Sequence, residues 1–308
     1  MGASAAAADA PSLVLDHLTA EDGLPQATVM TALQDSQGFV WLGTEDGLVR
    51  YDGRELYRYA RSRTEQGSLP GNYVWQVVED AQTNLWIALN DAGVAKWSRR
   101  TDTFTSYRHS PNDPRSIATD RVRTVLVDTR GFVWIGTFDA GVDVLDPATG
   151  TVEHLRNDPS NLGSLASDRV STLMLDRAGD VWIGTDSGLN RWHSATRTMT
   201  RVGPPAGDPS SLHDKKINRI LEDQSGTLWI GTFGTGLLRM DRDGRVLETF
   251  RHDARDPASL ASDDVRALLE DRSGRLWVGT TDSLALLDRY AGTFTHYRHD
   301  ALSFASCR

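Results

Sequence analysis

Short apolar runs alternate with polar turns along almost the whole chain. The runs are four to six residues long, as in Val122–Val127 and Leu237–Met240, and apolar and polar positions tend to alternate within them. That length and a period of two residues indicate β-strands, and no useful length of sequence follows the 3.6-residue period of a helix. The pattern therefore predicts an all-β protein.

The apolar runs recur in a unit of nearly constant length. The string Trp-aliphatic-Gly-Thr occurs five times, and a degenerate sixth copy, Trp86-Ile87-Ala88-Leu89, fills the one gap. Successive tryptophans are 45, 48, 48, 47 and 48 residues apart, at Trp41, Trp86, Trp134, Trp182, Trp229 and Trp277. A period of about 40 to 50 residues is typical of β-propeller blades.

A turn motif precedes each tryptophan. Six residues before it stands an aspartate, at Asp35, Asp80, Asp128, Asp176, Asp223 and Asp271. Three residues after the aspartate comes a glycine in every copy except the second, which has Thr83. A carboxylate that bonds its own turn, followed by a glycine at positive φ, predicts a tight turn between two strands.

Four runs per unit predict one four-stranded antiparallel sheet, and such sheets bury their faces by stacking around an axis. The fold class is thus a β-propeller of four-stranded blades, with the repeat tryptophan on the second strand and packed between blades. Trp97 and Trp192 are assigned to the core. The six repeats are interpreted as part of a seven-bladed ring, with a closed six-bladed ring as the alternative, and residues 13–18 predict one further strand.

The repeats also set the predicted domain organisation. Residues 13–299 form a single propeller domain, and residues 300–308 are a C-terminal remnant. Residues 1–12 are rich in alanine and fit either the stub of an export signal or a disordered tail, because small residues suit a cleavage site but the basic and apolar regions of a signal are missing.

Composition removes several classes of function. The 33 basic residues against 42 acidic ones give a net charge of −9, which argues against a nucleic acid partner. No run approaches the roughly 20 apolar residues that span a bilayer, so this chain has no predicted membrane segment. The single cysteine, Cys307, excludes an intrachain disulfide and a cysteine-based zinc site.

The motif Asp-x-x-Gly-x-(Val/Leu)-Trp-(Ile/Leu/Val)-Gly-Thr resembles the two-component regulator propeller repeat, and so does the segment His17 to Pro25. This resemblance implies a periplasmic or extracytoplasmic sensor region of a hybrid histidine kinase or a diguanylate cyclase. It further implies a small polar ligand such as a carbohydrate, and a homodimer in the full-length protein. The family shares no catalytic residues that could be assigned here, and the second copy departs from the pattern at Thr83, Ala88 and Leu89.

Catalytic motifs are not found. The sequence has no phosphate-binding loop, zinc-protease motif, calcium loop or nucleophile elbow. His109, His252 and His299 recur at one position of the repeat, which indicates a structural role, and no cofactor or metal is predicted. A non-catalytic sensor is therefore the main hypothesis. A protein-docking scaffold and a lyase similar to streptogramin lyase are the alternatives.

Positions that differ between repeats are the candidates for ligand binding. Because strand direction alternates, loops between second and third strands share one end of the ring with the starts of the first strands. The loops supply Glu45, Asp46, Asn90, Asp91, Phe138, Asp139, Asp186, Phe233 and Asp282. The starts of the first strands supply Tyr73, Trp75, Arg121, Arg123, Lys216, Asn218 and Arg266. Aromatic rings beside amides and charged groups suit a polar ligand with a planar face.

Overall fold

The computed structural model describes residues 18–203 and 211–297, and these residues form 24 β-strands in six antiparallel sheets of four. The predicted class, an all-β propeller of four-stranded antiparallel blades, is confirmed with six blades, and the described residues contain no seventh. Within each sheet the spatial order of the strands equals their order in the sequence. No helix occurs in these two ranges, and hence none that could cross a membrane.

The strands group into six blades, numbered in chain order. Blades 1 and 2 comprise β1 (Val29–Gln34), β2 (Val40–Thr44), β3 (Gly47–Tyr51), β4 (Leu56–Tyr59), β5 (Val74–Glu79), β6 (Leu85–Leu89), β7 (Val94–Ser98) and β8 (Thr103–Tyr107). Blades 3 and 4 comprise β9 (Val122–Val127), β10 (Val133–Thr137), β11 (Val142–Asp146), β12 (Thr151–Leu155), β13 (Val170–Leu175), β14 (Val181–Thr185), β15 (Gly188–His193) and β16 (Thr198–Arg201). Blades 5 and 6 comprise β17 (Ile217–Glu222), β18 (Leu228–Thr232), β19 (Leu237–Met240), β20 (Val246–Phe250), β21 (Val265–Glu270), β22 (Leu276–Thr280), β23 (Leu284–Asp288) and β24 (Thr293–Tyr297).

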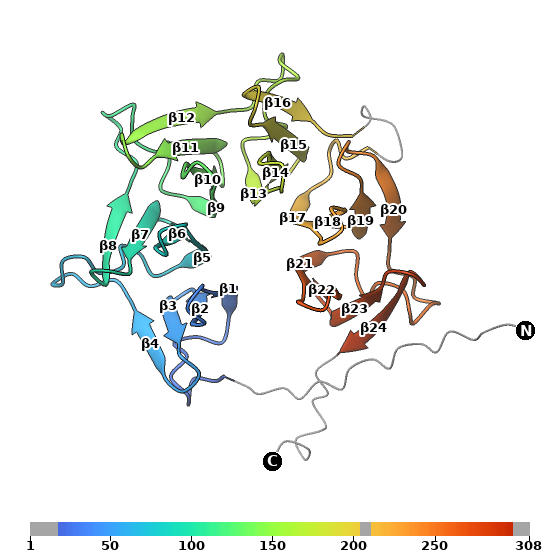
Figure 1. Cartoon of the computed structure of the whole chain (residues 1–308), viewed down its shortest axis with the longest axis horizontal. Helices are drawn as coiled ribbons and strands as arrows, with labels where there is room; N and C mark the ends of the chain where they lie inside the picture. The colour runs from blue at the N-terminus through green and yellow to red at the C-terminus, as the bar shows by residue number, and fades with distance from the viewer. Residues whose placement is uncertain (1–17, 204–210, 298–308) are drawn as a thin grey trace, which may run out of the picture.

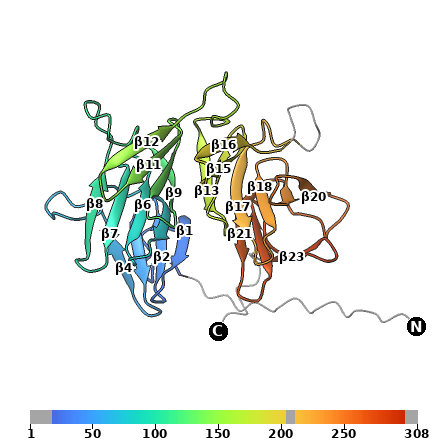
Figure 2. The ribbon, with the colours of Figure 1, turned by 45° about the horizontal axis from the view of Figure 1, so that its top comes forward.

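The blades stand around a central opening, with the first strand of each blade innermost (Figure 1). Seen obliquely, β9, β13 and β17 stand upright beside this opening (Figure 2). Each innermost strand packs against the innermost strand of the next blade, from β1 through to β21. Within the residues that the structure describes, comparable packing does not recur between β21 and β1, and the ribbon leaves its widest gap there (Figure 1).

The repeat aspartate organises both the turn and the tryptophan. In blade 4, one oxygen of Asp176 accepts the backbone N–H groups of Ala178 and Asp180, each at 2.9 Å. The other oxygen accepts the indole N–H of Trp182 at 2.9 Å. The same indole–carboxylate bond forms in all six blades, at 2.8 to 3.2 Å. The buried indole N–H is thereby satisfied, which a tryptophan in a core requires.

Five of the six repeat tryptophans are buried between blades, as predicted. Trp41, Trp86, Trp134, Trp182 and Trp229 are each 0–1% exposed, and each packs with the core of the following blade. Trp97 and Trp192 also lie in the core, at 2% and 6% exposure.

Glycine after the tryptophan allows the next blade to approach closely. A Cβ added to Gly184 would lie 2.8 Å from a methyl group of Ile217 on β17, and the corresponding distances for Gly43 and Gly231 are 2.6 Å. These contacts join the second strand of one blade to the first strand of the next. The close approach of neighbouring sheets therefore depends on the missing side chain.

The two ends of the series of blades lack this covering. Trp277 in blade 6 is partly exposed, and a Cβ on Gly279 would meet only Ala267 of its own blade. At the other end, Val29 of blade 1 is 41% exposed, although its counterparts Val74 and Val265 are fully buried. Blades 1 and 6 thus each present one uncovered face among the described residues.

The departures in the second repeat are accommodated by ordinary blade geometry. Thr83 takes the position of the turn glycine with a positive φ of 63°, and its N–H donates to the carbonyl of Asp80 at 2.9 Å like the glycines. Ala88 and Leu89 are both fully buried. The predicted segments 1–12 and 300–308, and the strand expected at 13–18 apart from Leu18, lie outside the described residues.

Candidate functional site

Each innermost strand carries a β-bulge near its start. The register of all six first strands shifts at the same place, as between Val74 and Gln76 in blade 2. The unpaired bulge residues are Met30, Trp75, Arg123, Ser171, Asn218 and Arg266. A bulge re-aims side chains at the edge of a ladder, and such positions are common beside binding sites. The residue type at the bulge differs from blade to blade, so the channel wall varies while the rest of the blade repeats.

A cavity of about 120 Å³ opens between these strands. Its walls are formed by the bulge residue and the next residue of several blades: Met30, Thr31, Trp75, Gln76, Arg123, Thr124, Ser171, Thr172 and Arg219. Since one water takes about 30 Å³ of liquid volume, the cavity has room for a few waters or for one small polar group of a ligand.

The two sets of candidate residues predicted from the sequence do lie together. In four blades, the loop between the second and third strands donates a backbone N–H to the residue at or near the start of the first strand. These bonds are Asn90 to Tyr73, Phe138 to Arg121, Asp186 to Arg169 and Phe233 to Lys216, at 2.9 to 3.1 Å. The loops and the first-strand starts of these four blades consequently meet at one end of the channel, which we call the channel mouth.

Aromatic rings and arginines cluster at the mouth beside blades 2 and 3. The ring of Trp75 lies 5.0 Å from that of Tyr73 and 5.4 Å from that of Phe138, measured between centroids. Arg123 stands over both Trp75 and Phe138, at 5.8 and 5.5 Å. The indole N–H of Trp75 donates to Asn90 Oδ1 at 3.1 Å, which fixes the ring. These contacts form the Trp75 cluster: Tyr73, Trp75, Asn90, Arg123 and Phe138.

A second group lies beside blades 5 and 6. Phe233 is 46% exposed, with Lys216 at 5.4 Å and Arg266 at 5.5 Å from its ring centre. Lys216 also lies 3.6 Å from Asp186, whose other carboxylate oxygen accepts from Arg169 at 2.8 Å. An exposed ring flanked by cations is a surface that a planar polar group can stack on.

The remaining candidates are placed differently. Glu45 accepts from Tyr73 and Gln26, Asp46 pairs with Arg58 at 2.6 Å, and Asp139 pairs with Arg121 at 2.7 Å. Asp91 and Asp282 are exposed. Asn218 is 4% exposed and its amide donates to the carbonyl of Val265 at 3.1 Å, so it joins blade 5 to blade 6.

Arg219 is a channel residue that the sequence did not single out. It follows the bulge residue Asn218, lines the cavity, and donates to the backbone carbonyl of Asn218 at 2.8 Å. Burial lowers the pKa of Arg219 from its ordinary value, and the charges of Arg123 and Arg266 lower it further. Burial likewise lowers the pKa of Arg123, which Asp186 opposes. Three arginine charges are therefore held close enough to repel one another.

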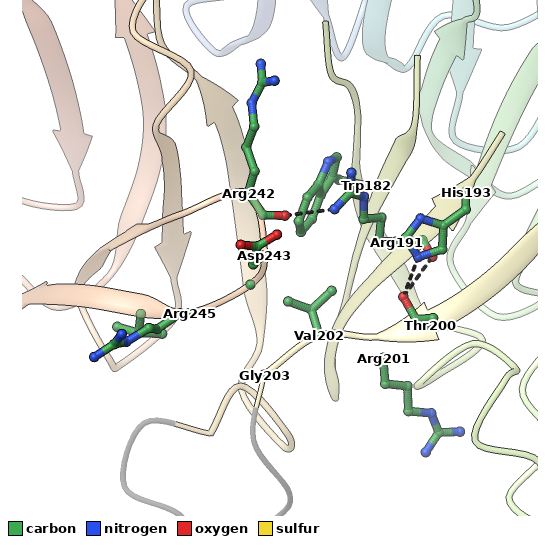
Figure 3. Close-up of a pocket in the computed structure, with 12 residues that line it drawn as sticks. Trp182, Arg191, His193, Thr200, Arg201, Val202, Gly203, Arg242, Asp243 and Arg245 are labelled. Atoms are coloured by element: carbon green, nitrogen blue, oxygen red, sulfur yellow. Dashed lines mark hydrogen bonds between the residues drawn. The ribbon is translucent and has the colours of Figure 1, made fainter. Parts of the chain in front are cut away.

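A larger hollow, of about 800 Å³, lies away from the innermost strands, between blades 4 and 5 (Figure 3). It is lined by residues of β14 to β16 and of the β19–β20 turn, including Trp182, Arg191, His193 and Arg242. Two of its four arginines are already engaged: Arg191 donates to Asp180 at 2.9 Å and to the carbonyl of Arg242 at 2.7 Å, and Arg242 pairs with Glu222. Figure 3 shows the bond from Arg191 to Arg242 and the one between His193 and Thr200.

Acid–base pairs in the described residues lie away from the channel. His154 bonds Asp143 at 2.7 Å and His193 bonds Asp180 at 3.2 Å, but each carboxylate also accepts from an arginine. Both histidines lie on the third or fourth strand of a blade. No group of three or more potential metal ligands comes together in residues 18–203 and 211–297.

The repeat is identified by comparison with models of known sequence families. The sequence model described as "two component regulator propeller" matches residues 23–46, 68–91, 164–187, 211–234 and 259–282. The chain carries the two-component regulator propeller repeat. Each match contains the turn aspartate and the tryptophan of one blade, and the third repeat, which has the same motif, forms the same blade. No protein of curated function matches the chain in sequence.

Solved structures with the same fold come from bacterial surface and signalling proteins. The extracellular domain of BT3049 from B. thetaiotaomicron, described as a hybrid two component system, aligns over 92% of this chain with 25% identity and a TM-score of 0.75. The extracellular domain of BT4673 from the same organism, described as a one component system, aligns over 87% of this chain with 22% identity and a TM-score of 0.69.

A third structure, PorZ of Porphyromonas gingivalis, is an essential surface component of the type-IX secretion system. It aligns over 84% of this chain with 21% identity and a TM-score of 0.64, so it shows the fold alone. The chain spans little more than a third of each of the three larger structures, at 36%, 35% and 38% of their lengths.

Proposed function

We propose that this propeller is the non-catalytic, ligand-sensing domain of an extracytoplasmic signalling protein, and that a small polar ligand such as a carbohydrate binds at the channel mouth. The observation that carries the proposal is the Trp75 cluster. It places a partly exposed indole, oriented by Asn90, beside an arginine at the bulge positions where the blades differ most.

The chemistry of the mouth suits binding more than reaction. Aromatic faces bind the apolar face of a sugar ring, and amide and guanidinium groups bind its hydroxyls, as concave sites with a few fixed polar groups do. The resemblance to the extracellular domains of BT3049 and BT4673 supports a place outside the cytoplasm and a signalling role. A ligand that favours one arrangement of the blades, or one dimer, would shift that equilibrium by its differential affinity.

The test is a panel of oligosaccharides titrated against the protein while thermal unfolding is followed. At about 100 times Kd a ligand stabilises the native state by about 2.7 kcal/mol, which moves the midpoint by several degrees. Trp75→Ala should abolish the shift. Tyr290→Ala is the matched control, because Tyr290 is fully exposed and lies on the β23–β24 turn.

Two outcomes would contradict the proposal. One is that no member of a broad panel raises the midpoint of the wild-type protein. The other is a shift that survives in Trp75→Ala, since the ligand would then bind away from the Trp75 cluster.

A further inference from the structure

Two of the arginines that line the channel cavity form no ion pair with a carboxylate. In the described residues, no carboxylate lies within 4 Å of the guanidinium groups of Arg123 or Arg219. Elsewhere in these residues, 23 pairs of a basic and an acidic group lie within 4 Å, 21 of them with arginine or histidine and two with lysine. Of the 28 arginines in the described residues, 16 have a carboxylate within 4 Å and 12 do not, and the two that line the cavity are among these 12.

The two unpaired arginines face the same small space. Arg123 comes from β9 and Arg219 from β17, so they approach the cavity from different blades. Arg266 of β21 adds a third charge to the same field, and its nearest carboxylate, Asp264, is 4.0 Å away. Asp186, the acid whose charge acts on Arg123, is bonded through one carboxylate oxygen to Arg169 at 2.8 Å. The local excess of positive charge is thus built from several blades in a protein of net charge −9.

Further residues complete the lining. Thr31, Thr172 and Trp75 all line the cavity. Arginine presents a planar fork of donors that matches the two oxygens of a carboxylate, sulfate or phosphate. The cavity of about 120 Å³ has room for such a group.

We propose that the channel cavity binds an oxyanion, carried as a carboxylate or sulfate group on the ligand, between Arg123 and Arg219, with Arg266 adding charge and Trp75 packing against the ligand. This inference rests on the proposed function and narrows it: the ligand is acidic. Burial and the charges of neighbouring arginines lower the pKa values of Arg123 and Arg219. A bound anion would stabilise the charged form of both arginines and offset their repulsion.

The experiment compares anions at equal ionic strength. Thermal unfolding and calorimetric titration are run with sodium sulfate, with sodium D-glucuronate, with D-glucose 6-sulfate and with D-glucose, each against sodium chloride. Sulfate and the two acidic sugars should raise the unfolding midpoint, and glucose should leave it unchanged at the same concentration. Comparison of glucuronate with the sulfated sugar identifies which acidic group the cavity prefers.

Variants separate binding from structure. Arg219→Gln should weaken sulfate binding at least tenfold and, because it relieves repulsion, raise the midpoint in the absence of anion. Arg123→Gln provides a second variant at the opposite side of the cavity and should behave in the same way. Arg115→Gln is the control, because the side chain of Arg115 is 75% exposed and contacts only Asp113 of the same loop.

The inference fails if sulfate stabilises no more than sodium chloride, or if Arg219→Gln and Arg123→Gln respond to sulfate like the wild-type protein. Neutral sugars that bind in a Trp75-dependent manner, without any response to sulfate, would overturn the acidic ligand and leave the sensor proposal standing. Sulfate binding without binding of any oligosaccharide would support the anion site and count against a carbohydrate ligand.

Discussion

Loss of the repeat tryptophan should cost much more stability between blades than on an uncovered face. Trp182 and Trp277 occupy the same position of their blades, and each donates its indole N–H to the turn aspartate, at 2.9 and 3.0 Å. Trp182 is 1% exposed and packs against blade 5, whereas Trp277 is partly exposed and lacks such a neighbour. The two sites differ mainly in the presence of the next blade.

The magnitude follows from the buried surface. A fully buried tryptophan removes roughly 200 Å² from water, which is worth about 5 kcal/mol at about 25 cal/mol per Å². Trp182→Ala should therefore lower the free energy of unfolding by about 3–5 kcal/mol, the range found for such truncations. Trp277→Ala loses the same hydrogen bond, but the packing contacts that it loses lie mainly within its own blade, such as the contact with the Tyr297 ring at 5.5 Å. This substitution should lower the free energy of unfolding by about 2 kcal/mol.

The assay is urea unfolding followed by far-ultraviolet circular dichroism, which reports on the sheets and not on the tryptophan that is removed. Phenylalanine at each position provides a conservative variant that keeps most of the packing. Equal losses at Trp182 and Trp277 would refute the reasoning, because they would mean that the face of blade 6 is covered in solution as fully as that of blade 4.

Further predictions concern the glycines, the unusual turn and the response to acid. Gly184→Ala should lower the unfolding midpoint, since its Cβ would lie 2.6 Å from Thr172 and 2.8 Å from Ile217, whereas Gly279→Ala should have little effect in the same thermal scans; similar losses would contradict this. Thr83→Gly should raise stability by about 1 kcal/mol in urea titrations, because a β-branched residue is strained at a φ of 63°, and a loss would contradict it. Burial raises the pKa of Asp35, but hydrogen bonds from Arg99, Trp41 and the backbone outweigh it and hold that pKa below 3.8. The stability that Asp35 contributes is therefore complete above about pH 5 and is lost as the pH falls through the folded-state pKa. Urea midpoints measured from pH 7 to pH 3 should fall less steeply in Asp35→Asn, and an unchanged slope would refute this assignment.

The repeat made most of the fold predictable. Its period marked six blades without deciding whether the ring has six or seven, and the turn aspartate and the tryptophan marked the same two positions in each blade. The indole–carboxylate bond was not predicted, although a constant spacing of six residues between Asp176 and Trp182, and in every other copy, was a signal for it. A turn can be inferred from local sequence, but a bond across the ladder depends on the register of two strands.

The candidate site was predictable only to the level of loops. Alternation of strand direction correctly brought the loop residues and the first-strand residues to one end. It could not separate Asn218, which is buried between blades, from Arg219, which lines the cavity. The bulge on β17 is the physical reason, because an extra residue interrupts the two-residue period on which the assignment of faces depends.

The strand order within each sheet has a consequence for how the chain acquires its shape. Every strand pairs only with strands adjacent to it in the sequence, so each blade is a meander that closes short loops. Loop-closure entropy is small for such connections, and rapid local folding of individual blades is expected. Each new blade then needs only its predecessor as a template, which allows folding to proceed along the chain during synthesis without waiting for the two ends to meet.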